Sequence, residues 1–390
     1  MERVETTPIR RRLKVLYVLP NLDYGGTTRI AISFASRAVR DGFSVKIVVL
    51  RGGAFLKKVP PSVQVIRLME GNNVAQMPTI LKGVFLIVKL AHLFKKERPN
   101  VVISDVTWLS TLVILCKLIC RTHFGLLIRV GNLKSRGPRK RSLIGTLERL
   151  SIRYLFPRAD RIIVPSNAVK EDLMKYFRIP KEKVTVIPNP VEIEEIQLKS
   201  LEPPVNYPSL ITGEPVFVTV CRLSERKGVR YLIEAFAVIS NQIKGYLVII
   251  GDGPQRKEFE ELVRRLGLSS RVHFLGHIPD PFNYVKRATA CIHPALWDGF
   301  GYAVVEAMAC GTPPIVLANS GGPAEIVEDG KNGLVVEPAN ISELGNAMLR
   351  LAKDAELRRH LADGALQTVR QYAAEEVISS YERLIIECVK

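Results

Sequence analysis

Several patterns are absent from this sequence of 390 residues. No apolar run reaches the ~20 residues that a helix needs to cross a bilayer. No Asp-x-Asp pair occurs, and the six histidines and six cysteines lack the spacing of a metal site. These absences argue against a bilayer-spanning protein and, more weakly, against a metalloenzyme.

The N-terminus has no apolar signal core with a cleavage site. Arg10, Arg11 and Arg12 lead directly into an apolar segment at residues 14–20. Nothing in the cysteine pattern calls for an oxidising compartment. We therefore expect a cytoplasmic location.

The composition is that of a soluble globular protein with two domains. Hydrophobic residues make up 47% of the chain, charged residues 24% and aromatic residues 7%. A chain of this length and composition can bury two cores.

The net charge of +18 is unevenly distributed. Residues 1–200 hold 36 Lys and Arg against 15 Asp and Glu, whereas residues 201–390 hold 20 against 23. Such a field attracts anionic membranes, nucleic acid or phosphorylated substrates. Nucleic acid is the poorest of these, because no basic groove motif with interleaved aromatic residues is present.

Short runs of Val, Ile and Leu alternate with longer helical patterns, which is typical of parallel α/β sheets. Strands are expected at 14–19, 44–50, 63–68, 101–104, 125–130, 161–164 and 184–187, and again at 216–221, 246–250, 272–275, 290–293, 314–317 and 333–335. The interpretation is two doubly wound Rossmann-like domains facing across a cleft. The expected division is an N-terminal domain at 1–200, a Pro-rich linker at 201–215, a C-terminal domain at 216–372 and a closing helix at 373–390 that packs back on the first domain.

Two apolar stretches call for a membrane test. The stretch 109–120 is best interpreted as a core helix. The helix expected at 79–98 has an unusually apolar surface flanked by lysines, so an interfacial helix on anionic lipid and a core helix remain about equal alternatives.

The segment 291–311 carries the most chemistry. A short strand leads into a loop with Asp298, a turn formed by Gly299, Phe300 and Gly301, and a helix with Glu306. A helix N-terminus preceded by glycines presents backbone N–H groups to a phosphate, and a carboxylate further along can accept hydrogen bonds from a ribose diol. The segment indicates a site for a nucleotide-sugar.

Two cations follow the strand at 216–221. Arg222 and Lys227 lie in the loop before Gly228 and a helix. At the carboxyl end of a strand such a pair can neutralise a diphosphate, the guanidinium by paired hydrogen bonds and the ammonium as a point charge.

Two glycine-containing loops are weaker signals. Gly25 and Gly26 follow the first strand, where glycines permit close approach of a ligand to the backbone. Gly251 and Gly253 lie in the sequence GDGP, which is not a dinucleotide fingerprint because Arg256 stands where the third glycine would be.

Together these motifs resemble the retaining glycosyltransferases of family 4, the glycosyl transferases group 1. The resemblance covers almost the whole chain and is strongest from Val218 to Pro338. It implies a GT-B fold, a UDP- or GDP-sugar donor, retention of anomeric configuration, and neither a metal nor another cofactor.

The resemblance also implies roles for individual residues. Arg222 and Lys227 would bind the diphosphate with the amides of 299–301, Glu306 the ribose, and Asp298 the donor sugar. Gly25 and Gly26 would line the opposite wall, and Gly251 and Gly253 the nucleobase side. Ser166 and Asn189 also match family positions, as caps or as ligands.

The sequence departs from the family pattern at two places. Asp298 stands where the family has Glu, so its carboxylate is one methylene shorter. On the acceptor side, Asp105, Arg129 and Asn132 are candidates, but the histidine of many relatives is missing. The basic run Lys134, Arg136, Arg139, Lys140 and Arg141 would either grip a lipid-linked pyrophosphate or form a solvated loop.

The leading hypothesis is transfer of a hexose or N-acetylhexosamine to a lipid-linked saccharide in cell-envelope polysaccharide or lipopolysaccharide synthesis. The protein would lie peripherally on the inner face of the plasma membrane, through its basic N-terminal domain. The alternatives are a nucleotide-sugar epimerase or phosphorylase on the same fold, and a non-catalytic sugar-nucleotide-binding protein.

Overall fold

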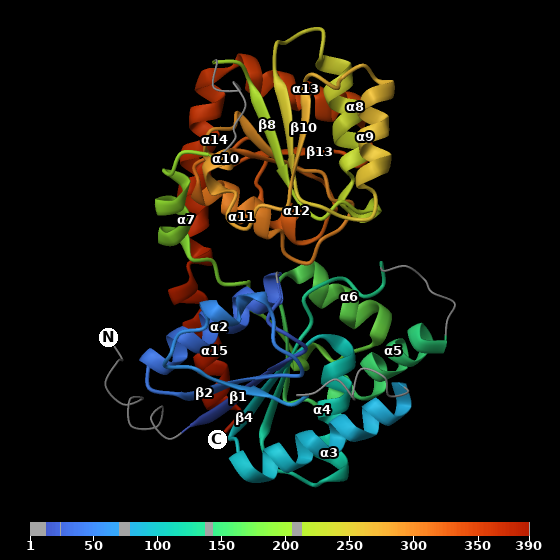
Figure 1. The fold of residues 1–390 in the computed structure, drawn as a ribbon, viewed down its shortest axis with the longest axis vertical. Coiled ribbons are helices and arrows are strands. Elements are labelled where there is room, and N and C mark those ends of the chain that lie inside the picture. The colour runs from blue at the N-terminus through green and yellow to red at the C-terminus, as the bar shows by residue number, and fades with distance from the viewer. Residues whose placement is uncertain (1–12, 24, 70–78, 137–142, 205–212, 390) are drawn as a thin grey trace. The chain divides into compact units, whose positions relative to one another are not determined.

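The computed structural model describes residues 13–23, 25–69, 79–136, 143–204 and 213–389 (Figure 1). The chain forms two compact units, the first made of Met1–Pro190 with Ala374–Lys390 and the second of Val191–Ala373. The first unit therefore ends ten residues earlier than the expected boundary at 200. Helix α7 (Ile193–Ser200) joins the second unit because it packs on helices α10 and α11 there.

The first unit is built on a seven-stranded parallel sheet with the order β3-β2-β1-β4-β5-β6-β7. The strands are β1 (Lys14–Leu19), β2 (Ser44–Val49), β3 (Gln64–Arg67), β4 (Val101–Asp105), β5 (Gly125–Arg129), β6 (Arg161–Val164) and β7 (Val184–Val186). β1 and β4 are buried nearly throughout, because helices cover both faces of the sheet.

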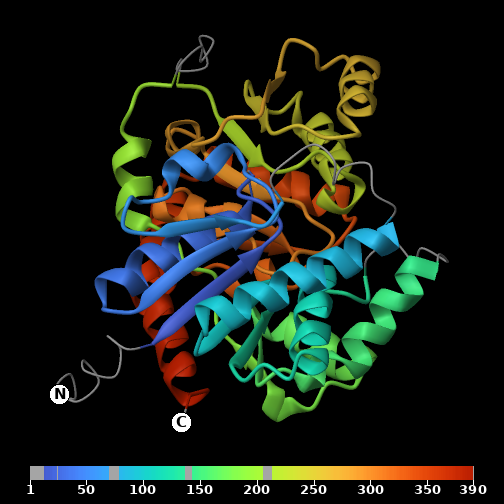
Figure 2. The same cartoon turned by 60° about the horizontal axis from the view of Figure 1, so that its bottom comes forward.

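Helices α2 (Gly26–Arg40) and α15 (Ala374–Glu387) lie on one face of this sheet, and α3 (Thr79–Glu97) and α4 (Thr107–Ile119) lie on the other (Figures 1 and 2). Phe34 of α2 and Tyr381 of α15 meet Tyr17 of β1 in one core cluster. The C-terminal helix thus completes the first unit. Helices α5 (Leu143–Tyr154) and α6 (Asn167–Phe177) complete the layer with α4.

The second unit has a six-stranded parallel sheet with the order β10-β9-β8-β11-β12-β13. Its strands are β8 (Val216–Val220), β9 (Tyr246–Ile250), β10 (Val272–Gly276), β11 (Ala290–His293), β12 (Pro314–Leu317) and β13 (Leu334–Val336). Its further helices are α8 (Val229–Ile239), α9 (Arg256–Arg265), α10 (Phe282–Lys286), α11 (Tyr302–Ala309), α12 (Gly322–Ile326), α13 (Ile341–Lys353) and α14 (Ala355–Thr368). Short 3₁₀ turns lie at Ala54–Lys58, Phe156–Arg158, Lys181–Lys183, Glu225–Lys227 and Val369–Tyr372.

All thirteen strands expected from the sequence are present, each within one residue of its expected ends. The two helices tested for a membrane role are α3 and α4. Over the ranges that the structure describes, no helix combines the length and apolarity needed to cross a membrane.

Both sheets reverse their strand order next to their first strand. In the first unit the reversal lies between β1 and β4, and in the second between β8 and β11. Loops that leave the carboxyl ends of these strands diverge to opposite faces of the sheet. Such switch points are where open α/β sheets bind their ligands.

Candidate functional site

The switch point of the second unit is formed by two loops, one after β8 and one after β11. They are tied together by a hydrogen bond of 2.8 Å from Leu296 N to Arg226 O. Gly228 has a φ of 63°, and a Cβ there would lie 2.0 Å from the carbonyl oxygen of Pro294. Only glycine permits this approach, so Gly228 sets the separation of the two loops.

A carboxylate and an ammonium meet between these loops. Lys227 Nζ lies 2.5 Å from Asp298 Oδ2, and the two side chains are 11% and 17% exposed. Burial by itself would raise the pKa of Asp298, but the Lys227 ammonium holds that pKa well below its usual range. Asp298 is therefore an anion at neutral pH. In this structure it forms an ion pair with Lys227, the cation that was expected to bind a diphosphate.

His293 is a third member of this group. It is the last residue of β11, its side chain is 3% exposed, and its Nε2 lies 3.3 Å from Asp298 Oδ2. Among the described residues Nε2 has no hydrogen-bond partner, so the ring faces the carboxylate without a hydrogen bond. Burial, and then the charge of Lys227, lower the pKa of His293, while Asp298 opposes them.

The loop that carries Asp298 is held by the turn after β12. Asp298 N donates to Ser320 O over 2.7 Å, and Gly322 N donates to Asp298 O over 3.0 Å. A Cβ at Gly322 would lie 2.5 Å from Phe300 Cα, so this glycine lets the two turns pack. Asp298 Oδ1 also accepts from Gly299 N over 2.9 Å, which fixes the carboxylate on its own turn.

The helix after this turn begins as the sequence predicts. Gly301 is the N-cap of α11 with a φ of 95°, and no side chain caps the helix there. The first N–H groups of a helix have no intrahelical acceptor, so this end suits an anion. Glu306 lies within α11 and is buried, with 8% of its surface exposed.

The other expected residues of this unit divide into two kinds. Arg222 is exposed at the end of β8. Gly251 and Gly253 let the loop after β9 pack on the loop after β8, since Cβ atoms there would lie 1.8 Å from Cys221 O and 2.3 Å from Leu223 O. These two glycines thus have a packing role in addition to any contact with a ligand.

The glycines expected on the opposite wall belong to the first unit. Gly25 is the N-cap of α2, and Gly26 begins that helix. Gly25 has a φ of 155°, and among the described residues outside its chain neighbours and its own helix no atom lies within 4 Å of the position of a Cβ. This helix start is open to a ligand on its own unit.

The candidates for an acceptor site, Asp105 and Arg129, instead form a buried ion pair. Arg129 also donates from Nε to Tyr381 Oη over 2.9 Å and from Nη2 to Asn189 Oδ1 over 2.7 Å. Tyr17 Oη lies 3.4 Å from the same Asp105 oxygen. Both side chains are committed to the core of the unit, so the expected acceptor role does not fit them.

The remaining acceptor candidates are only partly described. Asn132 is half-buried, and its Oδ1 accepts from Leu133 N over 2.9 Å. Lys134 lies 3.4 Å from Glu148, and Arg139, Lys140 and Arg141 lie outside the described residues. Ser166 caps α6, its hydroxyl accepting from Val169 N over 3.4 Å.

Helix α5 in the first unit has an exposed apolar face that was not expected from the sequence. Leu143, Leu147, Leu150 and Tyr154 recur at helical spacing on α5 and are 46–76% exposed, as is Ile144 beside them. On α3, Leu81, Val84 and Val88 are 56–62% exposed. Figures 1 and 2 both place the N-terminal end of α3 beside α5, so we call these two helix faces the α3–α5 apolar surface.

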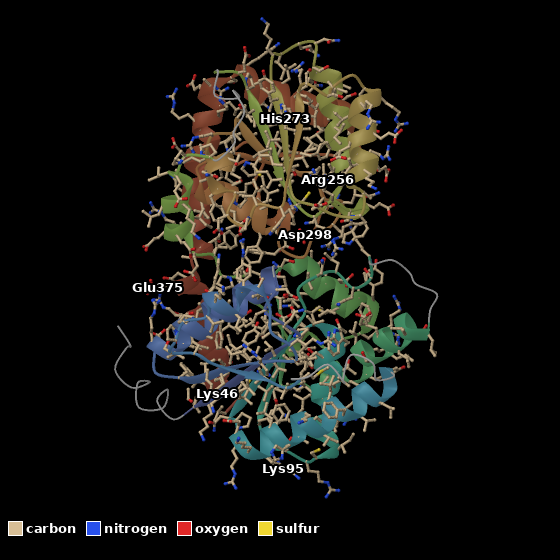
Figure 3. All side chains as sticks on the ribbon, in the orientation of Figure 1. Lys46, Lys95, Arg256, His273, Asp298 and Glu375 are labelled. Carbon is tan, nitrogen blue, oxygen red and sulfur yellow. The ribbon has the colours of Figure 1, made fainter. Side chains whose placement is uncertain are left out.

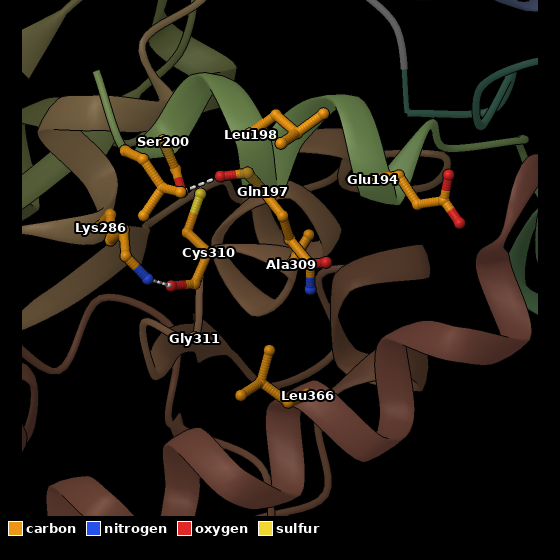
Figure 4. A pocket seen from close by; sticks show the side chains of 10 residues that line it. Glu194, Gln197, Leu198, Ser200, Lys286, Ala309, Cys310, Gly311 and Leu366 are labelled. Carbon is orange, nitrogen blue, oxygen red and sulfur yellow. Dashed lines mark hydrogen bonds between the residues drawn. The ribbon is translucent and has the colours of Figure 1, made fainter.

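A cavity of about 710 Å³ lies elsewhere in the second unit (Figure 4). It lies between α7 and the C-terminal end of α11, where Lys286 Nζ donates to Cys310 O over 3.5 Å. It contains none of the expected site residues.

Two family models match the chain. Glycosyltransferase Family 4 matches residues 24–195, and Glycosyl transferases group 1 matches residues 208–368. The chain belongs to glycosyltransferase family 4. The resemblance inferred from the motifs is therefore confirmed.

Individual relatives agree with this membership. An uncharacterized glycosyltransferase of Methanocaldococcus jannaschii is 28% identical over 78% of this chain and 83% of that protein. The N-acetylgalactosamine-N,N'-diacetylbacillosaminyl-diphospho-undecaprenol 4-alpha-N-acetylgalactosaminyltransferase of Campylobacter jejuni is 27% identical over 56% of this chain and 58% of its own length.

Solved structures show the same fold. Anabaena HepE in complex with UDP and glucose has a TM-score of 0.78 and 22% identity over 96% of this chain and 100% of that one. WaaG, a glycosyltransferase of lipopolysaccharide biosynthesis, has a TM-score of 0.72 and 19% identity over 95% of this chain and 99% of that one. Both are GT-B glycosyltransferases, and the predicted GT-B fold is confirmed.

Proposed function

We propose that this glycosyltransferase moves a hexose or N-acetylhexosamine, with retention, from a UDP- or GDP-sugar to a lipid-linked saccharide acceptor. It would work without a metal at the cytoplasmic face of the membrane, in the synthesis of a cell-envelope polysaccharide or lipopolysaccharide. The observation that carries the proposal is the meeting of Lys227 and Asp298 at the switch point of the second unit.

The residues of this site fit the parts of a nucleotide-sugar. Lys227 and the exposed Arg222 bind the diphosphate, together with the amides at the start of α11. Glu306 accepts hydrogen bonds from the ribose, and Asp298 contacts hydroxyls of the donor sugar. These two acids lie in one segment, so a single donor molecule can reach both.

The chemistry required is stabilisation of the leaving diphosphate. As the bond between the sugar and the phosphate breaks, negative charge grows on the phosphate oxygen. Fixed cations and amide dipoles stabilise this charge, and each such donor contributes about 3–4 kcal/mol to the transition state. The acceptor hydroxyl attacks from the face that the diphosphate leaves, and its proton passes to the leaving oxygen.

The relatives support the donor and the acceptor separately. HepE was crystallised with UDP and glucose, and the Campylobacter jejuni enzyme is named for a diphospho-undecaprenol acceptor. The proposal for this chain combines a nucleotide donor with an acceptor of that class.

A thermal-shift panel of UDP- and GDP-sugars tests the donor site. A true donor raises the melting temperature by mass action, by an amount that grows with its concentration. We expect Lys227→Ala or Glu306→Ala to reduce both the shift and the rate of transfer strongly, with the fold retained. Lys331→Ala, which changes an exposed lysine of the same unit, is the control.

Other outcomes would replace the proposal. Conversion of the donor sugar without an acceptor would identify an epimerase. Binding without release of UDP or GDP in the presence of any lipid-linked acceptor would identify a non-catalytic binding protein. Loss of turnover after a metal chelator is added would contradict the metal-independent mechanism.

We further propose that the α3–α5 apolar surface lies on an anionic bilayer. Lys89, Lys95 and Lys96 are exposed on α3, and Arg149 is exposed on α5. Figure 3 shows Lys95 on the outer side of α3. An apolar helix face flanked by lysine and arginine binds anionic lipid through buried apolar area and charge together.

Vesicle flotation tests this surface. The protein should float with vesicles that contain phosphatidylglycerol and stay behind with phosphatidylcholine alone. Leu147→Glu should reduce flotation several-fold. Val238→Glu, which changes an equally exposed apolar residue of α8 in the second unit, should leave flotation unchanged. Equal flotation of the two variants would rule out the surface.

A further inference from the structure

One carboxylate oxygen in the proposed donor site serves two partners. Asp298 Oδ2 lies 2.5 Å from the Lys227 ammonium and 3.3 Å from Nε2 of His293. The ammonium comes from the loop after β8, and the imidazole from the end of β11. In this arrangement the Lys227 ammonium is paired with Asp298 and is not free to bind a diphosphate.

His293 has no role in the transfer as proposed above, yet it is buried directly beside the carboxylate of Asp298. The residue is 2% exposed, and among the described residues Nε2 finds no hydrogen-bond partner. Most buried polar groups are hydrogen-bonded, so an orphan that faces a carboxylate calls for an explanation.

Donor binding changes the charges around His293. The charged groups that face it are Lys227 and Arg226 from the loop after β8, and Asp298 from the loop that His293 itself begins. A diphosphate draws the Lys227 ammonium toward its own oxygens and so takes the nearest cation away from Asp298. A largely buried carboxylate without a cation is costly, and His293 is within reach to supply the charge.

We infer that donor binding is coupled to the uptake of one proton by His293, which then replaces Lys227 as the cationic partner of Asp298. The inference rests on the proposed function. The proton comes from the solvent, no covalent bond other than the new N–H is formed, and the imidazole gains one positive charge. Protonated on both nitrogens, the ring donates from Nε2 to Asp298 and keeps the carboxylate in place for the donor sugar.

The direction of the pH dependence follows from this exchange. With Lys227 beside Asp298, as in this structure, burial and the Lys227 charge keep the pKa of His293 below its usual value, so the ring is neutral at pH 7. Donor binding moves Lys227 away and brings phosphate charge near, which raises that pKa. Affinity for the donor should therefore rise as the pH falls through the pKa of the complex and level off below the pKa of the empty site. The slope should not exceed about tenfold per pH unit, the limit for one proton.

Calorimetric titration with UDP-glucose measures the proton directly. UDP-glucose is used because neither of its phosphates has a second ionisation near neutral pH, whereas the terminal phosphate of UDP titrates near pH 6. Titrations at pH 7 in PIPES and in Tris, whose ionisation enthalpies differ, give the number of protons taken up. We expect a value between zero and one for the wild-type protein.

Two variants assign the proton. His293→Asn should remove the uptake and flatten the pH dependence of affinity, and His293→Gln should do the same. His273→Asn is the matched control, since burial also lowers the pKa of His273 on β10, far from Asp298 in the same unit (Figure 3). Its uptake should equal that of the wild type.

The results separate this inference from the proposed function. If UDP-glucose, UDP-N-acetylglucosamine and GDP-mannose all fail to bind, the proposed function fails and the inference with it. If a donor binds with no proton uptake, or if His293→Asn takes up as many protons as the wild type, the inference alone is overturned.

Discussion

Each sheet carries an ion pair at the carboxyl ends of two neighbouring strands, but the pairs differ in what surrounds them. In the first unit Asp105 and Arg129 stand at the ends of β4 and β5, both nearly fully buried. In the second unit Lys227 and Asp298 stand in the loops after β8 and β11, where both side chains keep some exposure. Both pairs lie where strands end, and the side chains around each pair decide whether its charges can reach a ligand.

The pair in the first unit is closed. Three nitrogens of Arg129 reach Asp105, Tyr381 and Asn189, and these partners come from β4, α15 and the segment before Pro190. Such a network fixes the C-terminal helix to the sheet and leaves no charge for a ligand. The pair in the second unit is open, since a single contact holds Lys227 to Asp298 and His293 stands beside it without a hydrogen bond.

Removal of the closed pair should have the largest effect on stability. Arg129→Met leaves Asp105 as a buried anion, and breaking a buried pair in this way costs about 3–5 kcal/mol. The measurement is denaturant unfolding followed by fluorescence. Trp108 lies in the first unit and Trp297 in the second, so Trp297→Phe and Trp108→Phe backgrounds report each unit separately.

The double variant sharpens this prediction. Asp105→Leu with Arg129→Met removes both charges and should recover part of the lost stability, because an apolar pair leaves no charge uncompensated. Unchanged unfolding of the Trp108 reporter in Arg129→Met would show that the network does not hold the first unit together.

Removal of the open pair's cation should act on turnover instead. Lys227→Ala should lower kcat/KM by a factor of about 10²–10³, equivalent to the ~3–4 kcal/mol that one preorganised donor supplies. The assay is release of UDP or GDP with a lipid-linked acceptor. A variant that keeps more than a tenth of the wild-type rate would contradict the diphosphate role of Lys227.

A smaller effect is expected from the C-terminal helix. Tyr381→Phe removes one acceptor of the Arg129 guanidinium and should destabilise the first unit by about 1.5–3 kcal/mol, the range for a hydrogen bond to a charged group. The Trp108 reporter should register the loss, and the Trp297 reporter should not. A loss confined to Trp297 would mean that α15 stabilises a different unit from the one it packs on.

Much of the fold could be predicted because its signals are local. Each strand is a short apolar run between turn residues, and Gly301 begins α11 where the sequence places the glycine turn. Lys227 and Asp298 each follow an expected strand, and the resemblance to the family assigns both to one donor site.

The rest depends on partners that are distant in sequence. Arg129 is 252 residues from Tyr381 and 60 from Asn189, and no spacing predicts that these side chains meet. His293 is a single histidine at the end of an apolar strand, with no pattern to mark it. The stripe on α5 has regular helical spacing, but periodicity alone cannot tell a face turned to the core from one turned to solvent.

The central claim is that Lys227 pairs with Asp298 until a diphosphate binds and replaces Asp298 as the partner of the ammonium. The most direct test is the dissociation constant of UDP for Lys227→Ala and Asp298→Asn, measured side by side through Trp297 fluorescence in the Trp108→Phe background. Lys227→Ala should weaken UDP binding at least tenfold, because the ammonium is lost. Asp298→Asn should tighten it several-fold, because the ammonium is released while UDP carries no sugar for Asp298 to contact. A shift in the same direction for both variants, or no shift in either, would contradict the claim.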